Sequence, residues 1–327
     1  MPAPATLTLV VDDAFRGIRL LDFLARELPG CHPVDLRRIV KGGAVSVNGE
    51  DCLADRGMRG GDVVQVVASQ VPKPRPSGKD GGLEVLFESS TCLVVHKPPG
   101  LTTVPDRLGA HASVHAALPG LRPDADLRIV HRLDRDTSGC LVLGKGLAAA
   151  QHFDRLFRDG EVQKTYTALV HGVPGETFSI DAWLGPDPRR PGKVVASATA
   201  LPGSKEAHTD VVRTAAFARH ALLALRPTTG RSHQLRVHLQ WAGYPIVGDA
   251  DYGGAPLLLS QLKPGYKLRP GVVERSLTPR MFLHAGRIAF HDLDGTPVDA
   301  EAPLPEDLTL ALHKLEAFDH RRRRPCD

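Results

Sequence analysis

Long apolar runs are missing from this 327-residue chain. The longest, such as residues 221–225, are far shorter than the roughly 20 residues that cross a bilayer, and the N-terminus has no basic segment followed by an apolar core. We therefore expect neither membrane insertion nor export.

Paired cysteines and several familiar motifs are missing too. The five cysteines are scattered, odd in number and never spaced C-x-x-C, which argues against a disulfide framework and a zinc knuckle. A cytoplasmic location therefore fits best. The G-x-S-x-G elbow of Ser-His-Asp hydrolases is also absent.

The net charge alone does not indicate which kind of partner the protein binds. The net charge is +4 and the pI is about 8.8. Such a small excess permits a polyanionic partner but would be equally ordinary for a metabolic enzyme. Hydrophobic residues make up 42% of the chain, enough to bury the core of one large or two ordinary domains.

A Pro- and Gly-rich segment divides the chain. Residues 69–82, "SQVPKPRPSGKDGG", contain one valine as the only large apolar side chain, so they predict an extended linker. We expect one domain over residues 1–68, a second over 83–318, and a basic tail over 319–327.

The first segment has the pattern of two short helices followed by strands. "IRLLDFLARELPG" and "PVDLRRIVKGG" have helical spacing, whereas "AVSVNGE" and "GDVVQVV" alternate as strands around an Asn-Gly turn. Residues 1–68 carry eight basic and nine acidic residues, so clustering rather than net charge would mark a binding face. The segment resembles the small RNA-binding domain of the ribosomal-protein-S-four type, also called alpha-L. This resemblance implies RNA contacts from the outward helical face, by Arg19, Arg37, Arg38 and Lys41.

From residue 83 onward strands and helices mix without strict alternation. Strand patterns include 93–100, 164–172 and 221–227, and amphipathic helices are expected at 147–160 and 233–243. This mixture predicts an α+β fold with a mixed, mainly antiparallel sheet flanked by helices.

A charged loop, "HRLDRDTSG" at 131–139, lies between two apolar strand patterns. Asp134 is the first candidate for chemistry, although a loop aspartate often only accepts backbone hydrogen bonds. With Asp136 it would form a glycosidase pair only if the loop turned sharply. In a metal site, Arg132 and Arg135 would compete with the cation for the carboxylates.

Two further clusters carry polar groups suited to a site. In "TTGRSHQLRVHL", Gly230, Arg231 and Ser232 are expected at a helix start, with Ser232 as the N-cap, a place that can hold a carboxylate or a phosphate. In "KTYTALVHG", Lys164 and Tyr166 share one face of a strand, so Tyr166 either packs in the core or delivers its phenol into a pocket.

Together these clusters resemble the motifs of the RluA family of RNA pseudouridine synthases, in this order and spacing. "HKPPGLTTVP", "GYPIVGDADYG" and "FLHAGRIAFHDL" add to the resemblance, which runs from about residue 83 to 305. It implies isomerisation of specific uridines to pseudouridine in structured RNA, without cofactor or metal. The expected partner is RNA, with ribosomal RNA of the large subunit favoured over transfer RNA, and a monomer is the default expectation.

The resemblance also implies roles for individual residues. Asp134 would be the catalytic carboxylate, Arg231 its charge partner, and Tyr166 the aromatic that stacks on uracil and removes the C5 proton. Leu235 would wall the pocket, and Arg107 would fill the stack left by the extruded base. His131, Arg132 and Arg135 would hold the polyanion over Asp134.

Two alternatives stay open. One is a catalytically silent RNA-binding protein that keeps the fold. The other is a nucleoside or glycoside hydrolase, which would release free uracil.

Overall fold

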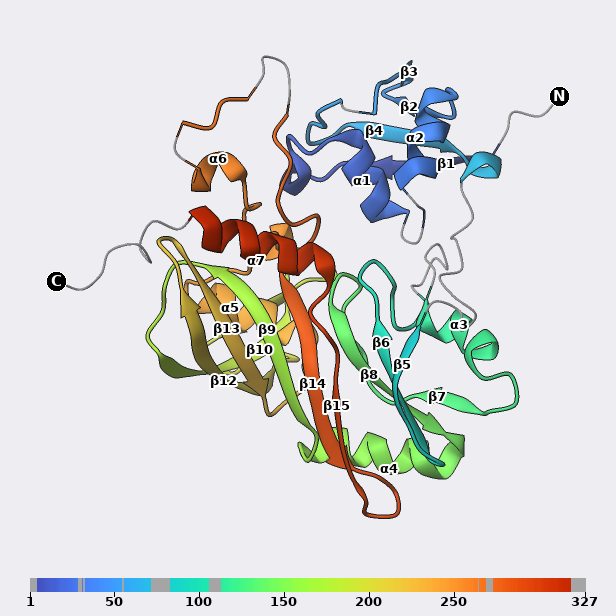
Figure 1. Ribbon diagram of the computed structural model, residues 1–327, viewed down its shortest axis with the longest axis vertical. Helices are drawn as coiled ribbons and strands as arrows, with labels where there is room; N and C mark the ends of the chain where they lie inside the picture. The colour runs from blue at the N-terminus through green and yellow to red at the C-terminus, as the bar shows by residue number, and fades with distance from the viewer. Residues whose placement is uncertain are drawn as a thin grey trace.

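The computed structural model contains two separate sheets (Figure 1). It describes residues 5–28, 31, 33–54, 56–71, 83–105, 113–263, 265–268 and 273–318. Arg107, most of the expected linker (72–82) and the basic tail lie outside these residues. No described helix is long and apolar enough to cross a membrane.

The N-terminal unit, residues 5–71, has a four-stranded antiparallel sheet in the order β1-β4-β2-β3. Its core consists only of its own side chains, among them Leu20, Phe23 and Leu36. Strand β1 was not expected from the sequence. The elements are β1 (Thr6–Val10), η1 (Asp13–Phe15), α1 (Leu20–Glu27), α2 (Pro33–Lys41), β2 (Val45–Val47), β3 (Glu50–Asp51), β4 (Val63–Val67) and η2 (Ala68–Gln70).

The C-terminal unit, residues 83–318, is built on one eleven-stranded sheet. Nine strands follow the order β11-β10-β12-β13-β9-β14-β8-β6-β5, with β15 paired to β14 and β7 to β8. The α+β fold with a mixed, mainly antiparallel sheet is therefore confirmed. The strands are β5 (Glu84–Glu88), β6 (Cys92–Lys97), β7 (Leu127–Ile129), β8 (Ser138–Lys145), β9 (Gln163–His171), β10 (Thr177–Pro186), β11 (Val194–Ser197), β12 (Lys205–Ala216), β13 (His220–Pro227), β14 (Leu283–His291) and β15 (Pro297–Glu301).

Strand β14 joins the two halves of this sheet. It pairs antiparallel with β9 on one side and parallel with β8 on the other, the one parallel strand pair among those described. Gly139 makes this approach possible: its φ is +123°, and a Cβ atom there would lie 2.1 Å from the carbonyl oxygen of Ala285. The glycine of "DTSG" thus serves the close contact at the start of β8.

Helices cover the sheet at places that matter for the site. Helix α4 packs against β7 and β8, and α5 packs against β10, β11 and β12 (Figure 1). In α5 the first six residues are all buried, so this helix passes through the interior rather than along the surface. The helices are α3 (Val114–Leu121), α4 (Gly146–Asp159), α5 (Gln234–Trp241), η3 (Ala250–Tyr252), α6 (Leu259–Leu262) and α7 (Glu306–Phe318).

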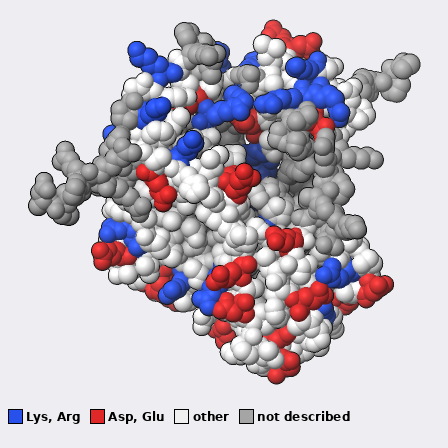
Figure 2. All heavy atoms as spheres, in the orientation of Figure 1, with Lys and Arg blue, Asp and Glu red and all other residues white. Residues whose placement is uncertain are grey.

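The two units touch at the charged loop. Arg26 of α1 lies 3.9 Å from the Asp136 carboxylate, and Arg135 lies 4.0 Å from Glu27. Ion pairs at such distances contribute little to the stability of the contact between the units, about 0–1 kcal/mol each. On the face shown in Figure 2, Lys and Arg side chains gather over the N-terminal unit at the top, whereas the lower part carries mixed charges.

Domain boundaries near residue 75 stay a prediction, and deletion of residues 1–75 tests it. Because the core of residues 83–318 shares no side chain with the N-terminal core, we expect the remainder to unfold cooperatively in a thermal melt. Its RNA affinity should fall and depend less steeply on salt, because fewer counterions are released. A remainder without a cooperative transition would place the boundary elsewhere.

Candidate active site

A cleft of about 810 Å³ lies beside the charged loop. Four segments line most of it: the loop itself, the C-terminal end of α4, the start of β9, and the turn from β13 into α5. Six of the residues expected at the site line this cleft together: His131, Arg132, Asp134, Tyr166, Arg231 and Leu235. Arg135 does not line it.

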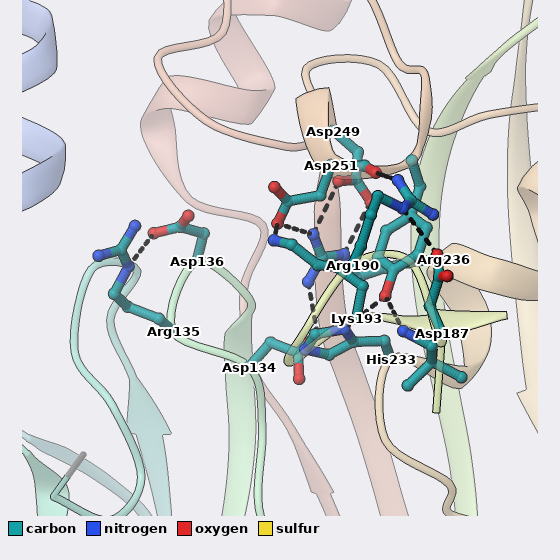
Figure 3. A network of polar contacts seen from close by, with 12 residues as sticks. Asp134, Arg135, Asp136, Asp187, Arg190, Lys193, His233, Arg236, Asp249 and Asp251 are labelled. Atoms are coloured by element: carbon teal, nitrogen blue, oxygen red, sulfur yellow. Dashed lines mark hydrogen bonds and ion pairs between the residues drawn. The ribbon is translucent and has the colours of Figure 1, made fainter. Parts of the chain in front are cut away.

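Asp134 is held by an arginine from α5. Arg236 Nη1 donates to Asp134 Oδ2 at 3.2 Å. The same guanidinium binds Asp249 through two bonds, of 2.7 and 2.8 Å, and Asp251 through one of 3.0 Å (Figure 3). Arg236 is buried, and it also lies over the ring of Tyr252 at 4.8 Å. It therefore gives Asp134 a fixed positive neighbour.

The expected pairing of Arg231 with Asp134 is wrong. Arg231 is exposed, and its Nε donates to the backbone oxygen of Glu206 at 3.0 Å. Its backbone N–H donates to Gln234 Oε1 at 2.9 Å, so this amide is already satisfied. "GRSHQLR" contains two arginines, and only the second, one turn into α5, points at the carboxylate.

Helix α5 also begins one residue later than expected. His233, not Ser232, is the N-cap; it has a left-handed backbone (φ 52°, ψ 20°) and makes no side-chain cap hydrogen bond. Its Nδ1 instead lies 2.7 Å from the hydroxyl of Tyr252. The strained turn aims His233 into the cleft, and Gln234 holds the preceding loop through Thr229 and Arg231.

Asp251, one of the three carboxylates around Arg236, is charged. Burial by itself would raise the pKa of Asp251, but hydrogen bonds and charge from Lys193 and Arg236 outweigh it and lower the pKa to about 2. Lys193 Nζ lies 2.6 Å from Asp251. Three carboxylates thus share two cations, and the one that faces the cleft is Asp134.

The loop around Asp134 is fixed from below. Buried Lys97, from "HKPPG", donates to the backbone oxygens of Pro98, Leu101 and Arg135 at 2.9, 2.7 and 3.0 Å. Three acceptors match the three N–H bonds of an ammonium group. The sequence pattern of this motif does not by itself identify the lysine as a supporting residue.

Two other side chains complete this support. Thr103 Oγ1 both donates to Leu133 O (2.9 Å) and accepts from Leu133 N (3.0 Å). Arg280 donates to the backbone oxygen of Asp136 at 2.9 Å and to Ser138 Oγ at 3.0 Å. Such support places a carboxylate accurately before substrate binds.

Tyr166 presents its ring to the same cleft from β9. Burial raises the pKa of its phenol well above the ordinary value, and the negative charge of Asp134 raises that pKa further. The resting side chain is therefore a neutral phenol. Its hydroxyl forms no hydrogen bond with another described residue.

Two residues expected to hold a polyanion, His131 and Arg135, have other partners in the structure, and their contact with RNA stays a prediction. Burial, together with the charge of Lys164, lowers the pKa of His131 to about 3, so its imidazole is neutral. Its Nε2 accepts from Val142 N at 2.8 Å, and its ring stacks on Phe157 at 4.2 Å. Arg135 faces Asp136 and Glu27 instead of the cleft.

On the N-terminal unit, Arg19 is not on the outward face. It is buried and gives two bonds to Asp22, at 2.9 and 3.0 Å. Arg37, Arg38 and Lys41 are exposed on α2, and Arg38 pairs with Asp35 at 3.1 Å. Arg37 and Lys41, four residues apart, form no ion pair with a described residue.

Within the described part of the chain, no three His, Cys, Asp or Glu side chains could hold a metal ion.

Comparison with known proteins agrees with this site. A family model described as RNA pseudouridylate synthase matches residues 91–241, a range that contains Asp134, Tyr166 and Arg236. The chain is 33% identical to ribosomal large subunit pseudouridine synthase C of Vibrio cholerae, covering 93% of this chain and 95% of that protein. The chain belongs to the RNA pseudouridine synthase family. It therefore catalyses isomerisation of uridine to pseudouridine in RNA.

Other relatives lie within the same family. The chain is 32% identical to ribosomal large subunit pseudouridine synthase C of Escherichia coli K12, over 96% of this chain and 97% of that one. Of the solved structures, human RNA pseudouridylate synthase domain containing 4 is 25% identical with a TM-score of 0.55, and it covers 71% of this chain and 92% of its own.

Replacing the two arginines separately distinguishes their roles. Arg236→Met should lower the free energy of unfolding by about 3–5 kcal/mol, because it leaves the buried carboxylate of Asp249 without its partner. Arg231→Met, the matched control, should change it by about 0.5 kcal/mol or less, as an exposed substitution does. Urea denaturation measures both free energies of unfolding. Equal losses in the two variants would contradict the assignment of Arg236 as the buried partner of the carboxylates.

Proposed function

We propose that this enzyme isomerises a uridine in large-subunit ribosomal RNA, with Asp134 as its catalytic carboxylate. The relatives named ribosomal large subunit pseudouridine synthase C or D, at 30–33% identity over more than nine-tenths of this chain, support that RNA class. One observation supports the residue: Asp134 is the carboxylate that both faces the cleft and contacts the buried Arg236.

The reaction breaks the bond between uracil N1 and ribose C1′ and rejoins the base through C5. Asp134 acts in its ionised form, either by attacking C1′ or by removing the C2′ proton. Arg236 holds one oxygen of this carboxylate, so the other oxygen stays available to the substrate.

Tyr166 stacks on the uracil in this scheme. Its phenol is neutral at rest because burial raises its pKa, and the negative charge of Asp134 raises that pKa further. Once Asp134 is bonded to C1′ or carries the C2′ proton, that charge is gone and its effect on the Tyr166 pKa ends. Tyr166 can remove the C5 proton only as a phenolate, so its phenol must first release its own proton, and loss of the Asp134 charge makes that release less unfavourable. Leu235 forms an apolar wall of the cleft.

RNA reaches the cleft with its target base extruded from the stack. Arg132 and Arg231, both exposed and both lining the cleft, are placed to contact the strand. Arg37, Arg38 and Lys41 of α2 offer a second, sequence-independent contact to phosphates. Insertion of Arg107 into the stack stays a prediction. We also propose that the enzyme acts as a monomer in the cytoplasm.

Tritium release from RNA labelled at uridine C5 tests the proposal. Unmodified large-subunit ribosomal RNA should release tritium with wild type, whereas Asp134→Asn should be slower by at least about 10³-fold, because an amide cannot replace the carboxylate. Asp136→Asn is the matched control: the same substitution, two residues away, in a side chain that does not line the cleft. It should keep activity within about tenfold.

The remaining outcomes separate the alternatives. Tritium release from transfer RNA alone would show that the substrate is transfer RNA and not ribosomal RNA. Free uracil in the products would indicate a hydrolase. Substantial activity of Asp134→Asn would refute its assignment as the catalytic carboxylate.

A further inference from the structure

Lys164 has an unusual environment for a buried cation. Five basic residues in the described part of the chain are buried: Arg19, Lys97, Lys164, Arg236 and Arg280. Four of them have carboxylate or carbonyl partners. Lys164, which is 8% exposed, forms no ion pair or hydrogen bond with any described residue.

The neighbours of Lys164 do not neutralise it. Its Nζ lies 5.9 Å from the centre of the Phe157 ring, near the outer limit of a cation–π contact. His131, whose ring stacks on Phe157, is neutral. Burial lowers the pKa of Lys164 to about 8, and no negative charge offsets this. Lys164 lines the cleft and its ammonium has no protein partner among the described residues, so it is available to an anion that enters the cleft.

The cleft places Lys164 near the reacting nucleotide. Lys164 and Tyr166 are two residues apart on one strand and both line the cleft, so they are spaced about 7 Å along β9. A uracil stacked on Tyr166, with its C1′ at Asp134, leaves its ribose and phosphate to extend along the cleft wall.

We propose that Lys164 binds a phosphate group of the target strand, the one attached to the extruded uridine. This inference rests on the proposed function and adds a phosphate subsite beside the reaction centre. Other charged groups also line the cleft, namely Arg132, Asp154, Arg158, Asp159 and Arg231. Asp154 and Arg158 pair with each other at 3.2 Å and are exposed, so neither supplies the missing partner.

Mononucleotides test the subsite directly. Calorimetric titrations would use wild type, Lys164→Met and Lys164→Arg. The ligands would be uridine 5′-monophosphate, uridine 3′-monophosphate, uridine and inorganic phosphate. We expect at least one monophosphate to bind wild type about tenfold tighter than uridine, as a charge-assisted contact allows. This preference should be lost in Lys164→Met and kept in Lys164→Arg. A preference unchanged in Lys164→Met, or none in wild type, would overturn the proposal. Inorganic phosphate binding as tightly as the nucleotide would make this a free-anion site only.

Stability and pH distinguish binding from a structural role. Lys164→Met should unfold at the same or a higher temperature, because it removes an unpaired buried charge; a loss of stability would indicate a structural lysine. For wild type, KM for ribosomal RNA in tritium release should rise as pH increases through about 8, since the deprotonated amine no longer attracts phosphate. Lys164→Arg should lack this rise, while every other group titrates as in wild type.

Failure of the two proposals would look different. Wild type that releases no tritium from ribosomal RNA, yet still prefers a uridine monophosphate through Lys164, would refute the RNA target and leave the subsite in place. Release with unchanged KM and salt dependence in Lys164→Met would refute the subsite alone.

Discussion

One buried guanidinium holds the site together. Arg236 binds Asp249 from two nitrogens and still reaches Asp251 and Asp134, so segments separated by more than a hundred residues meet at a single planar group. A lysine could not do this, because its point charge lacks the fork of donors that engages several carboxylates at once. The orientation of Asp134 thus depends on this one contact.

The second constraint is the backbone beneath Asp134. Lys97 and Thr103 come from one segment and Arg280 from another, and each bonds main-chain atoms of the charged loop. Hydrogen bonds to main-chain atoms fix the path of the loop whatever its side chains do. Asp134 therefore stays directed at the cleft, while Arg135 and Asp136 of the same loop pair with each other at 3.4 Å.

Sequence reasoning found the parts of the site that local pattern encodes. Asp134 between two strands, Tyr166 on a strand face and Leu235 on a helix are positions that periodicity or motif can identify, and all three line one cleft. The mixed sheet followed from the same patterns. Strand β1 was missed because a five-residue alternating segment at a terminus carries little signal of its own.

Predictions from the sequence were wrong where the role of a residue depends on the direction in which the fold points its side chain. Arg231 and Arg236 occur in one motif, and only the turn at His233 determines which of them points to Asp134. Arg19 has the spacing of an outward residue, yet it marks the start of α1 and lies buried against Asp22. Burial of His131 and of Lys164 depends on packing from α4, which no local pattern reveals.

The central place of β14 has a consequence for how the protein is made. Ser138 and His284, paired across the seam between β8 and β14, are 146 positions apart in the chain. During synthesis, β8 and the loop before it leave the ribosome long before β14 exists, and Arg280 arrives only just ahead of that strand. The catalytic centre is consequently completed last, so a nascent or C-terminally truncated chain exposes the basic side chains of α2 before it has any means of modifying a base.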